Sequence, residues 1–344
     1  MACSGDSASV SSQQRPKNKV IQFFMPTSSS TNPNSSARVC AVIITFNRRE
    51  VLRQCLASLR AQTRPVDQIL VINNASSDGT HEMLDADPDL VALHLGENGG
   101  PSRGFYEGFN WVRDHGFDFA WAVDDEGWAE PDCLQSLLEP AHPNAVVVPM
   151  KQDSQNRVYG IHIWKGRDLD IALEMQGQDE AQQQVIRRDD LIFDITSTLL
   201  GRGVLEKIGP YKRNFFIWFD DFEYALRAKE HPEIEVLAVP RVLFHHDWGI
   251  NTRQVHFLGR TSLRSDQPAW KLYYGARNPF YTLIRRGHPQ EIALFLLVQT
   301  RLLLMDIVFE ADRWLRVRLR LKGFADGFAG RLGKRVLPGS GRNR

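Results

Sequence analysis

Short apolar runs alternate with helical patterns across residues 39–149, and this alternation restricts the fold more than any other feature of the chain. A nearly unbroken apolar run such as Val39–Phe46 is typical of a strand that is buried on both faces. Four similar runs follow, at Gln68–Ile72, Leu90–Leu95, Phe117–Val123 and Ala145–Pro149. Helices are predicted between them, beginning near Arg49 and Asp78 and covering Ser102–His115 and Pro131–Leu138. The order predicts an α/β fold with a mostly parallel sheet and helices on both faces.

Polar loops follow four of these predicted strands. They are Thr45–Arg48, Asn73–Asp78, Asn98–Arg103 and Asp124–Glu126. In a parallel sheet, ligands bind beyond the carboxyl ends of the strands, so the four loops are expected to meet at one rim. This rim is the predicted functional site.

Three consecutive acids, Asp124, Asp125 and Glu126, end the apolar run Phe117–Val123. Carboxylates held close together repel one another and raise one another's pKa. A divalent cation removes this cost, and Mg²⁺ and Mn²⁺ both prefer such oxygen ligands. The pattern therefore predicts a metal site, with a solvated acidic loop as the alternative.

Composition divides the chain into three parts. Residues 1–37 are rich in Ser, Gln, Asn and Pro and are predicted to form a disordered tail. Residues 38–250 are predicted to form the catalytic unit, with a first half at 38–150 and a second at 151–250, and residues 251–344 a basic helical region. No secretory signal is expected at the start, and no uncharged apolar run reaches the length of a membrane span. The four cysteines, Cys3, Cys40, Cys55 and Cys133, show no paired framework, which indicates structural thiols in a reducing compartment.

The loop sequences TFNR (Thr45–Arg48), NNASSDGT (Asn73–Thr80), ENGGPSRG (Glu97–Gly104) and DDEG (Asp124–Gly127) occur in this order. Their order and spacing resemble the inverting family 2 glycosyltransferases, which have the GT-A fold. The segments Phe215–Arg227 and Tyr273–Asn278 are similar to motifs of the galactofuranosyl and rhamnosyl branch. The resemblance covers Arg38–Arg286 and implies a nucleotide-diphosphate-sugar transferase with a Rossmann-like sheet.

The resemblance assigns the first three loops to the nucleotide of the donor. Thr45, Phe46 and Arg48 would hold a uracil or thymine base. Asn73 stands where the family carries Asp, and its carbonyl can still accept a hydrogen bond from the pyrimidine N3–H. Asn98 and Arg103 would lie near the nucleoside and diphosphate, with a simple turn as the alternative for Asn98.

The resemblance assigns the acids to the donor and its metal. Asp124 would face the ribose or the metal, Asp125 would lie beside the nucleotide, and Glu126 would bind the metal in place of the usual Asp. His245 or His246 would complete the metal site, since histidine suits Mn²⁺ and other transition ions. Strand alternation allows only one of the two to face the site, and His245 is favoured. The alternative is a structural histidine, and the other histidines are assigned no role.

The acceptor side is assigned to the segment that follows the aromatic run Phe215–Phe219. By resemblance, Asp221 is the general base that takes the acceptor proton, and Asp220 contacts or orients the acceptor. Glu223 is expected to pair with Arg227 one turn along a helix. The alternative is an ordinary helix start, where acids are favoured by the helix dipole.

The C-terminal region combines apolar and basic residues. Glu291–Phe309 is interrupted only by Arg301 and Asp306 and is predicted to form an amphipathic or buried helix. The basic residues that follow alternate with apolar ones and are typical of a helix lying on anionic lipid: Arg313, Arg316, Arg318, Arg320 and Lys322. A helical lid or an oligomer contact is the alternative. Nucleic acid is not expected as a partner, because no reader module is present.

The resemblance implies a metal-dependent inverting hexosyltransferase of cell-envelope polysaccharide synthesis. By the same resemblance the donor is expected to be UDP-galactofuranose, with dTDP-rhamnose as the alternative. The acceptor would be a glycan or a polyprenyl-linked glycan, and the protein would be cytoplasmic, peripheral at the inner face of the membrane. Two other classes remain open: a metal-dependent phosphodiesterase, and a non-catalytic nucleotide-sugar-binding protein.

Overall fold

The computed structural model describes residues 34, 36–164, 168–170, 185–247, 252–257 and 259–337. The predicted disorder of residues 1–37 therefore falls almost wholly outside the described residues, and Cys3 falls outside them as well. Cys40, Cys55 and Cys133 are buried, and burial raises the pKa of each thiol. These three are structural thiols, as the sequence predicted.

A ten-stranded sheet forms the centre of the chain, with its main path in the order β10-β13-β6-β12-β4-β1-β2-β3. The strands β1 (Val39–Thr45), β2 (Gln68–Asn73), β3 (Val91–His94) and β4 (Phe119–Asp124) run parallel, which confirms the predicted sheet. β12 (Thr198–Gly201) runs antiparallel between β4 and β6 (Ala145–Gln152). Among the described strands, the antiparallel pairs of this sheet therefore all involve a strand from residues 151–250.

Strand β13 (Glu235–His246) lies parallel to β6 and reaches back to the acidic loop. Its last residues pair with β5 (Gly127–Ala129), a short strand that the sequence did not predict. In this register His246 lies opposite Gly127 and His245 opposite Trp128. The histidine pair is thus brought across from the acids of residues 124–126.

The remaining short strands are β7 (Val158–Tyr159), β8 (His162–Trp164), β9 (Asp168–Asp170), β10 (Ile186–Arg187) and β11 (Leu191–Ile192).

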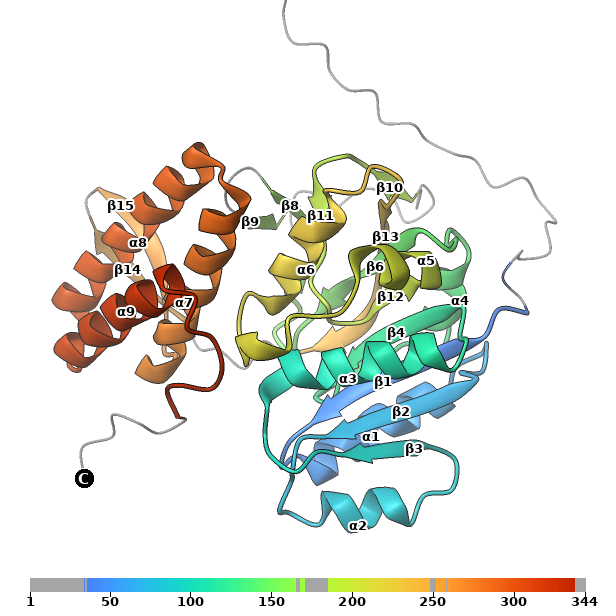
Figure 1. Ribbon diagram of the computed structural model, residues 1–344. Coiled ribbons are helices and arrows are strands. Elements are labelled where there is room, and N and C mark those ends of the chain that lie inside the picture. The colour runs from blue at the N-terminus through green and yellow to red at the C-terminus, as the bar shows by residue number, and fades with distance from the viewer. Residues whose placement is uncertain are drawn as a thin grey trace, which may run out of the picture.

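Helices cover both faces of the sheet because alternate residues of each strand point to opposite sides. In β1, Cys40 and Val42 belong to one buried core and Ala41 and Ile43 to the other. The first core packs against α3 (Gly100–Asp114), α5 (Arg202–Ile208) and α6 (Asp220–Ala228). The second packs against α1 (Arg49–Arg60), α2 (Thr80–Asp85) and α4 (Cys133–Leu138). Figure 1 shows α3 on one face of the sheet and α1 behind it.

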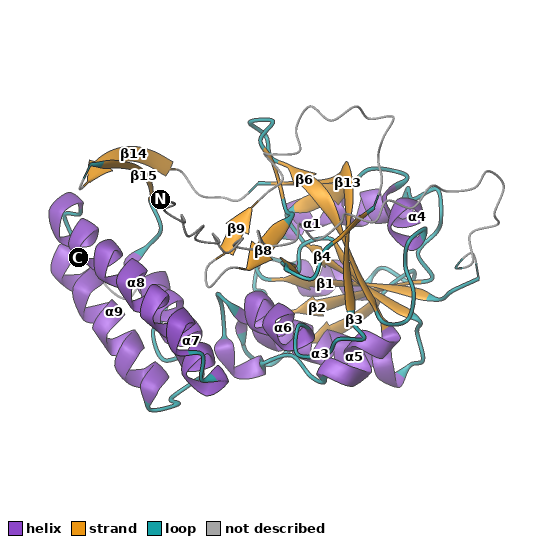
Figure 2. Cartoon of the chain, turned by 90° about the horizontal axis from the view of Figure 1, so that it is seen from above, coloured by secondary structure: helices purple, strands orange, loops and turns teal. Residues whose placement is uncertain are grey.

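The C-terminal region lies to one side of the sheet in both views (Figures 1 and 2). It consists of a hairpin, β14 (Thr252–Phe257) and β15 (Arg260–Ser265), and the helices α7 (Ala269–Arg286), α8 (Pro289–Phe309) and α9 (Arg313–Phe328). A third, smaller core joins this region to the sheet unit through Phe216, which packs with Tyr273, Tyr274 and Leu319. The C-terminal helices are therefore anchored on the segment that precedes α6.

Two expectations about the C-terminal region need correction. The sequence predicted an amphipathic or buried helix at Glu291–Phe309, but only Gln299, Met305 and Asp306 are buried in α8. By length and composition alone α8 could cross a membrane, which the sequence argued against, although one such helix is weak support for a span. Arg316 and Arg320, which were predicted to face a lipid surface, are buried in ion pairs instead.

Candidate active site

The three acids at the end of β4 are partly neutralised by Arg48. The guanidinium lies 2.9 Å from a carboxylate oxygen of Asp125 and 2.9 Å from one of Glu126. Asp125 is buried, and its burial raises its pKa to about 6 although Arg48 opposes this shift. Asp124 accepts a hydrogen bond from the hydroxyl of Thr196 at 2.6 Å. Arg48 is thus an internal cation of this acidic group, whereas the sequence analysis assigned it to the nucleobase.

His246 faces the acids. Its Nε2 lies 3.4 Å from Asp124 and 3.6 Å from Glu126. The hydroxyl of Tyr159 donates to the backbone oxygen of His246 at 2.8 Å, so its single proton is used there. The contact of 2.8 Å between the same hydroxyl and Nδ1 then requires Nδ1 to carry a proton. Burial lowers the pKa of His246, but the hydrogen bond with Glu126 and the charges of Asp124 and Glu126 outweigh burial and raise it. The neutral ring with its proton on Nδ1 would direct the lone pair of Nε2 toward the two carboxylates, which is the tautomer that metal binding needs.

His245 faces the other way. Its Nε2 lies 2.6 Å from Glu130, and its ring stacks on Trp128 with centroids 4.9 Å apart. The sequence analysis favoured His245 for the metal, but the structure brings His246 to the acids. The physical reason is the register of β13 against β5, which turns the even-numbered residue inward.

The chemistry of these side chains suits a divalent cation, although within the described part of the chain the ligand atoms of Asp124, Glu126 and His246 do not all lie within 4.8 Å of one another. Three carboxylates balanced by Arg48 leave two negative charges when His246 is neutral. Carboxylate oxygen and imidazole nitrogen together suit Mn²⁺ or a similar ion. Ligand atoms around an ion with bonds of about 2.1 Å lie roughly 3 Å apart, close to the separations of Nε2 from Asp124 and Glu126. Glu126 is shared with Arg48 in this structure, so binding an ion would compete with that ion pair.

Asp220 and Asp221 begin α6 on the opposite side of the same cavity. Asp220 is buried and accepts a hydrogen bond from Ser102 at 2.8 Å. Burial raises the pKa of Asp220 to about 6. The pKa of Asp221 is raised well above its usual range by burial first, and then by the negative charges of Asp220 and Asp194. The expected ion pair of Glu223 with Arg227 is confirmed, at 3.0 Å.

The backbone before Asp220 is strained. Phe216, Trp218 and Phe219 have φ values of 71°, 71° and 64°, in a region that residues other than glycine rarely adopt. Each such residue costs on the order of 1–3 kcal/mol and persists only when its surroundings hold it. We call residues 215–219 the base loop, because it sets the direction in which α6 presents its two acids.

Two buried residues of α7 hold the base loop. The amide of Asn278 donates to the backbone oxygens of Phe215, Ile217 and Trp218, at 3.2, 3.0 and 2.7 Å. Arg277 donates to Phe215 O at 2.7 Å and to Gly333 O at 2.6 Å. Burial lowers the pKa of Arg277, which stacks over Tyr274 at 4.8 Å. The sequence segment Tyr273–Asn278 thus supports the backbone that leads to Asp220 and Asp221 from outside the sheet.

The start of α3 meets the base loop from the other side. Gly100 has a φ of 77°, and a Cβ at this position would lie 1.9 Å from the backbone oxygen of Phe216. Ser102 contributes the hydrogen bond to Asp220. The sequence analysis gave this segment to the donor diphosphate. The structure also ties it to Asp220, because α3 and the base loop lie in direct contact.

The other residues assigned to the donor nucleotide lie in the loops at the rim, as the order of the loops predicted. Phe46 is exposed, and Asn73 is buried, where its carbonyl accepts the N–H of Ser76 at 3.0 Å. Asn98 caps its own turn through Gly100 N at 2.8 Å, which agrees with the turn alternative. Arg103 pairs with Glu97 at 3.1 Å on the surface. None of these four residues lines the cavity that holds the acids.

A buried ionic group beside the acids was missed at the sequence level. Lys151 lies 2.8 Å from Asp194, and His162 lies 3.2 Å from the same carboxylate. Burial alone would raise the pKa of Asp194, but Lys151 and His162 hold it well below its usual range. The three residues come from β6, from β8 and from the segment before β12. In the sequence, only Lys151 hinted at this group, as a charged residue directly after the apolar run Ala145–Met150.

A single cavity of about 730 Å³ joins these groups. Asp124 and His246 line it from the sheet, and Asp220 and Asp221 from α6. Its apolar walls include Trp164, Trp218 and Phe295, and its far side is formed by the C-terminal helices. The cavity therefore holds a candidate metal site and a pair of acids with raised pKa values in one space.

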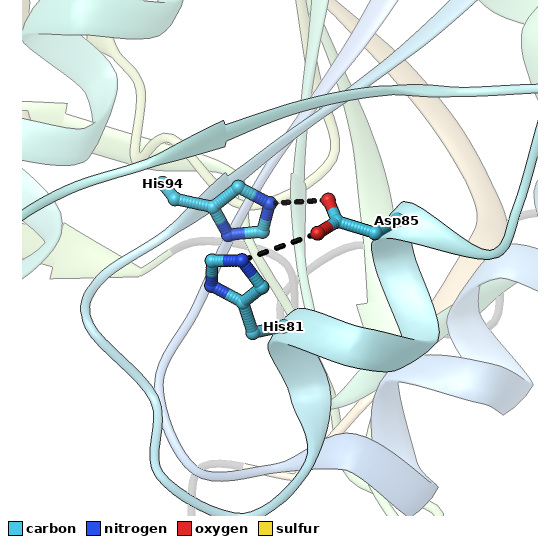
Figure 3. A group of neighbouring side chains, drawn as sticks. All are labelled: His81, Asp85 and His94. Carbon is cyan, nitrogen blue, oxygen red and sulfur yellow. Dashed lines mark hydrogen bonds and ion pairs between the residues drawn. The ribbon is translucent and has the colours of Figure 1, made fainter.

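A second histidine group lies on the opposite edge of the sheet. Figure 3 shows His81 and His94 facing the carboxylate of Asp85, at 3.1 and 3.0 Å. The amide of Asn73 donates to Nδ1 of His94 at 3.0 Å, so Nε2 carries the proton that points to Asp85. The three side chains satisfy one another through hydrogen bonds and do not line the cavity.

Comparison with known proteins places the chain among glycosyltransferases. Residues 40–209 match the family model described as "Glycosyl transferase family 2". The galactofuranosyltransferase GlfT1 of Mycobacterium tuberculosis is 34% identical over 266 residues, which cover 72% of this chain and 83% of the relative. The undecaprenyl-phosphate mannosyltransferase of Micrococcus luteus is 32% identical over 115 residues, covering 32% of this chain and 47% of the relative. A second GlfT1, from Mycolicibacterium smegmatis, is 33% identical over 117 residues, covering 33% of this chain and 38% of the relative.

Two solved structures share the fold. Staphylococcus aureus TarS 1–349 aligns with a TM-score of 0.53 at 12% identity, over 84% of this chain and 80% of that one. GalNAc-T7, crystallised with UDP, GalNAc and Mn²⁺, aligns with a TM-score of 0.50 at 14% identity, over 64% of this chain and 44% of that one. At these identities the likeness supports the fold alone.

Proposed function

Because the chain belongs to glycosyltransferase family 2 and has a GT-A fold, we propose that it is a metal-dependent inverting galactofuranosyltransferase. The donor would be UDP-galactofuranose, and the acceptor a glycan or a lipid-linked glycan of the cell envelope. One observation carries the proposal: Asp124 and His246 line the same cavity as Asp220 and Asp221, and Glu126 lies 3.6 Å from His246.

The donor side is supported by charge and by relatives. Asp124, Glu126 and His246 would hold a divalent cation, which when bound would offset the charge of the departing diphosphate. GlfT1 is named a galactofuranosyltransferase, and GalNAc-T7 was crystallised with UDP and Mn²⁺. The rim loops of Thr45, Phe46 and Asn73 would receive the uracil, with Asn98 and Arg103 nearer the diphosphate.

The acceptor side supports a single displacement. Asp221 would take the proton of the acceptor hydroxyl as the hydroxyl oxygen bonds to the anomeric carbon and the bond to the diphosphate breaks. A base must be ionised to accept a proton, and a raised pKa makes it a stronger acceptor once it is ionised. Asp220 would orient the acceptor or Asp221, since one of its oxygens is already bound to Ser102.

Membrane association is proposed through α8 rather than through the basic residues of α9. Leu297 and Val308 are 68% and 59% exposed, and the helix has few buried residues. An apolar helix face at the membrane surface would bring the cavity to a lipid-linked acceptor. We infer a peripheral position at the inner face, where nucleotide-sugar donors are available.

A donor panel tests this function. Thermal unfolding is measured with Mn²⁺ and either UDP-galactofuranose or dTDP-rhamnose, and transfer to an acceptor glycan is then assayed. A ligand at about 100 times its Kd stabilises a protein by about 2.7 kcal/mol, so the preferred donor is recognisable. Stabilisation and transfer with UDP-galactofuranose support the proposal. A response to dTDP-rhamnose alone would support dTDP-rhamnose as the donor. Donor binding without sugar transfer would support a non-catalytic role. Release of sugar in the absence of an acceptor would support a hydrolase.

A further inference from the structure

A short turn before β12 contacts one acid of the candidate metal site. The hydroxyl of Thr196, in this turn, donates to Oδ2 of Asp124 at 2.6 Å, and both residues line the cavity. We propose that Thr196 is a positioning residue, which fixes the carboxylate of Asp124 for a divalent cation. This inference rests on the proposed function and adds to it a residue that does not itself bind the cation.

The register of the sheet places Thr196 against Asp124. β12 pairs antiparallel with β4, and Thr198 lies opposite Ala122. Two residues back along β12 and two residues forward along β4, the same register brings Thr196 opposite Asp124. Residues directly opposite on antiparallel strands direct their side chains to the same face, so the hydroxyl reaches the carboxylate.

Three further contacts hold the turn of residues 194–197. One oxygen of Asp194 accepts both the backbone N–H of Thr196 at 3.0 Å and the ammonium of Lys151 at 2.8 Å. Nε1 of Trp121, which belongs to β4, donates to the hydroxyl of Ser197 at 3.3 Å. Ser197 is fully buried with a φ of 56°, a conformation that persists only when its surroundings hold it. The fold therefore fixes the place of the Thr196 hydroxyl independently of Asp124.

The hydrogen bond from Thr196 has the chemistry that a metal-binding carboxylate needs. Its length of 2.6 Å is typical of an O–H donor to an ionised carboxylate, and such bonds are roughly twice as strong as neutral ones. A carboxylate oxygen has two lone pairs, so Oδ2 of Asp124 can accept from Thr196 and still face Nε2 of His246, which lies 3.4 Å away. Partners of this kind orient metal ligands, and their loss typically costs about 10–100-fold in metal affinity.

Titration of Mn²⁺ by calorimetry tests the proposal without sugar transfer. The full-length protein is used, with UDP present throughout. Thr196→Val keeps the branched shape of the side chain and removes only the hydroxyl. We expect it to raise the Kd for Mn²⁺ about tenfold. Thr196→Ser keeps the hydroxyl and is expected to bind Mn²⁺ nearly as tightly as the wild type.

Thr198→Val is the matched control. Thr198 lies two residues further along the same segment, and its hydroxyl donates to the backbone oxygen of Asp194 at 2.7 Å. This variant loses a hydroxyl that supports the turn but does not touch a proposed metal ligand. We expect its Kd for Mn²⁺ to equal that of the wild type, even where its melting temperature is lower. A purely structural role of the turn would weaken Mn²⁺ binding alike in both valine variants.

The possible results separate this inference from the proposed function. The inference is overturned if Thr196→Val binds Mn²⁺ as the wild type does, if Thr198→Val is weakened equally, or if Thr196→Ser is as weak as Thr196→Val. A wild type that binds no Mn²⁺ overturns both the inference and the metal dependence. A wild type that binds Mn²⁺ with the expected order of variants, but transfers sugar equally well with a chelator, refutes the metal dependence and leaves the role of Thr196 standing.

Discussion

The side-chain amide of Asn278 donates a hydrogen bond to the backbone oxygen of Trp218 at 2.7 Å, across 60 residues of sequence. Trp218 has a positive φ and lies two residues before Asp220. The bond therefore ties α7, in the C-terminal region, to the strained backbone that directs the acceptor-side acids. Activity is expected to depend on this contact although Asn278 itself lies outside the lining of the cavity.

Replacing Asn278 by Ala should lower kcat at least tenfold with little change in the KM for the donor. The substitution removes the donors of three hydrogen bonds to the base loop, so Asp221 is no longer held in place, while the donor residues at the rim are untouched. Steady-state kinetics with varied donor measures both constants. Thr282→Val is the control, because Thr282 bonds only to Asn278 O within α7, at 3.0 Å. An unchanged kcat in the Asn278 variant would contradict the positioning role.

Asp221→Asn should abolish most transfer and also stabilise the fold near neutral pH. Loss of a general base typically costs about 10²–10⁴-fold in rate. Because the folded-state pKa of Asp221 is raised, its ionisation costs folding free energy as the pH rises above the usual carboxyl range. The variant should therefore melt at a higher temperature than wild type at pH 8 and at the same temperature near pH 3. Asp114→Asn, at an exposed acid of α3, should change neither quantity.

The rate of transfer should rise with pH through a limb at or above pH 6. Burial raises the pKa of Asp220 to about 6, and burial with the charge of Asp220 raises that of Asp221 well above its usual range, so the pair titrates above ordinary aspartates. Ser102→Ala removes a hydrogen bond that lowers the pKa of Asp220 and should move the limb to higher pH. A pH–rate profile measures this shift. Thr300→Ala is the control, because it removes a hydroxyl that bonds to Leu296 O within α8, and it should leave the profile unchanged. A limb at pH 4 in the wild type would exclude the Asp220–Asp221 pair as its source.

His246→Ala should weaken Mn²⁺ binding, whereas His245→Ala should leave it nearly unchanged. Only His246 directs a ring nitrogen at Asp124 and Glu126, and His245 is occupied by Glu130. Tyr159→Phe should have a smaller effect in the same direction, since it removes the group that sets the tautomer of His246. Calorimetric titration of Mn²⁺ in the presence of UDP measures the difference. The reverse order of the two histidine variants would refute the assignment.

The sequence was sufficient for the sheet and its rim because those follow from local patterns. The apolar run at Val39–Phe46 requires a buried strand, and parallel strands bring their carboxyl ends to one edge. The choice between His245 and His246 was not accessible in this way. Alternation predicts that the two point apart, but the register of β13 against β5, which follows the irregular stretch between Val239 and Phe244, decides which one faces inward.

The strain of the base loop and the burial of Arg316 were equally out of reach. Positive φ values at Phe216, Trp218 and Phe219 have no sequence signal, because none of the three is glycine or asparagine. Arg316 and Arg320 alternate with apolar residues as surface arginines do. Arg320 pairs with Asp306 near the end of α8, and Arg316 lies 3.9 Å from Glu310, the residue after that helix. Both contacts form only in the folded chain.

Gly100 has a further consequence for how α3 meets the base loop. The carbonyl of Phe216 occupies the space where any other residue at position 100 would carry its first side-chain carbon. The backbone at the start of α3 thus rests directly on the backbone of the base loop. The distance between α3 and the base loop is set by atomic radii at this contact, and one added methyl group would force the two segments apart.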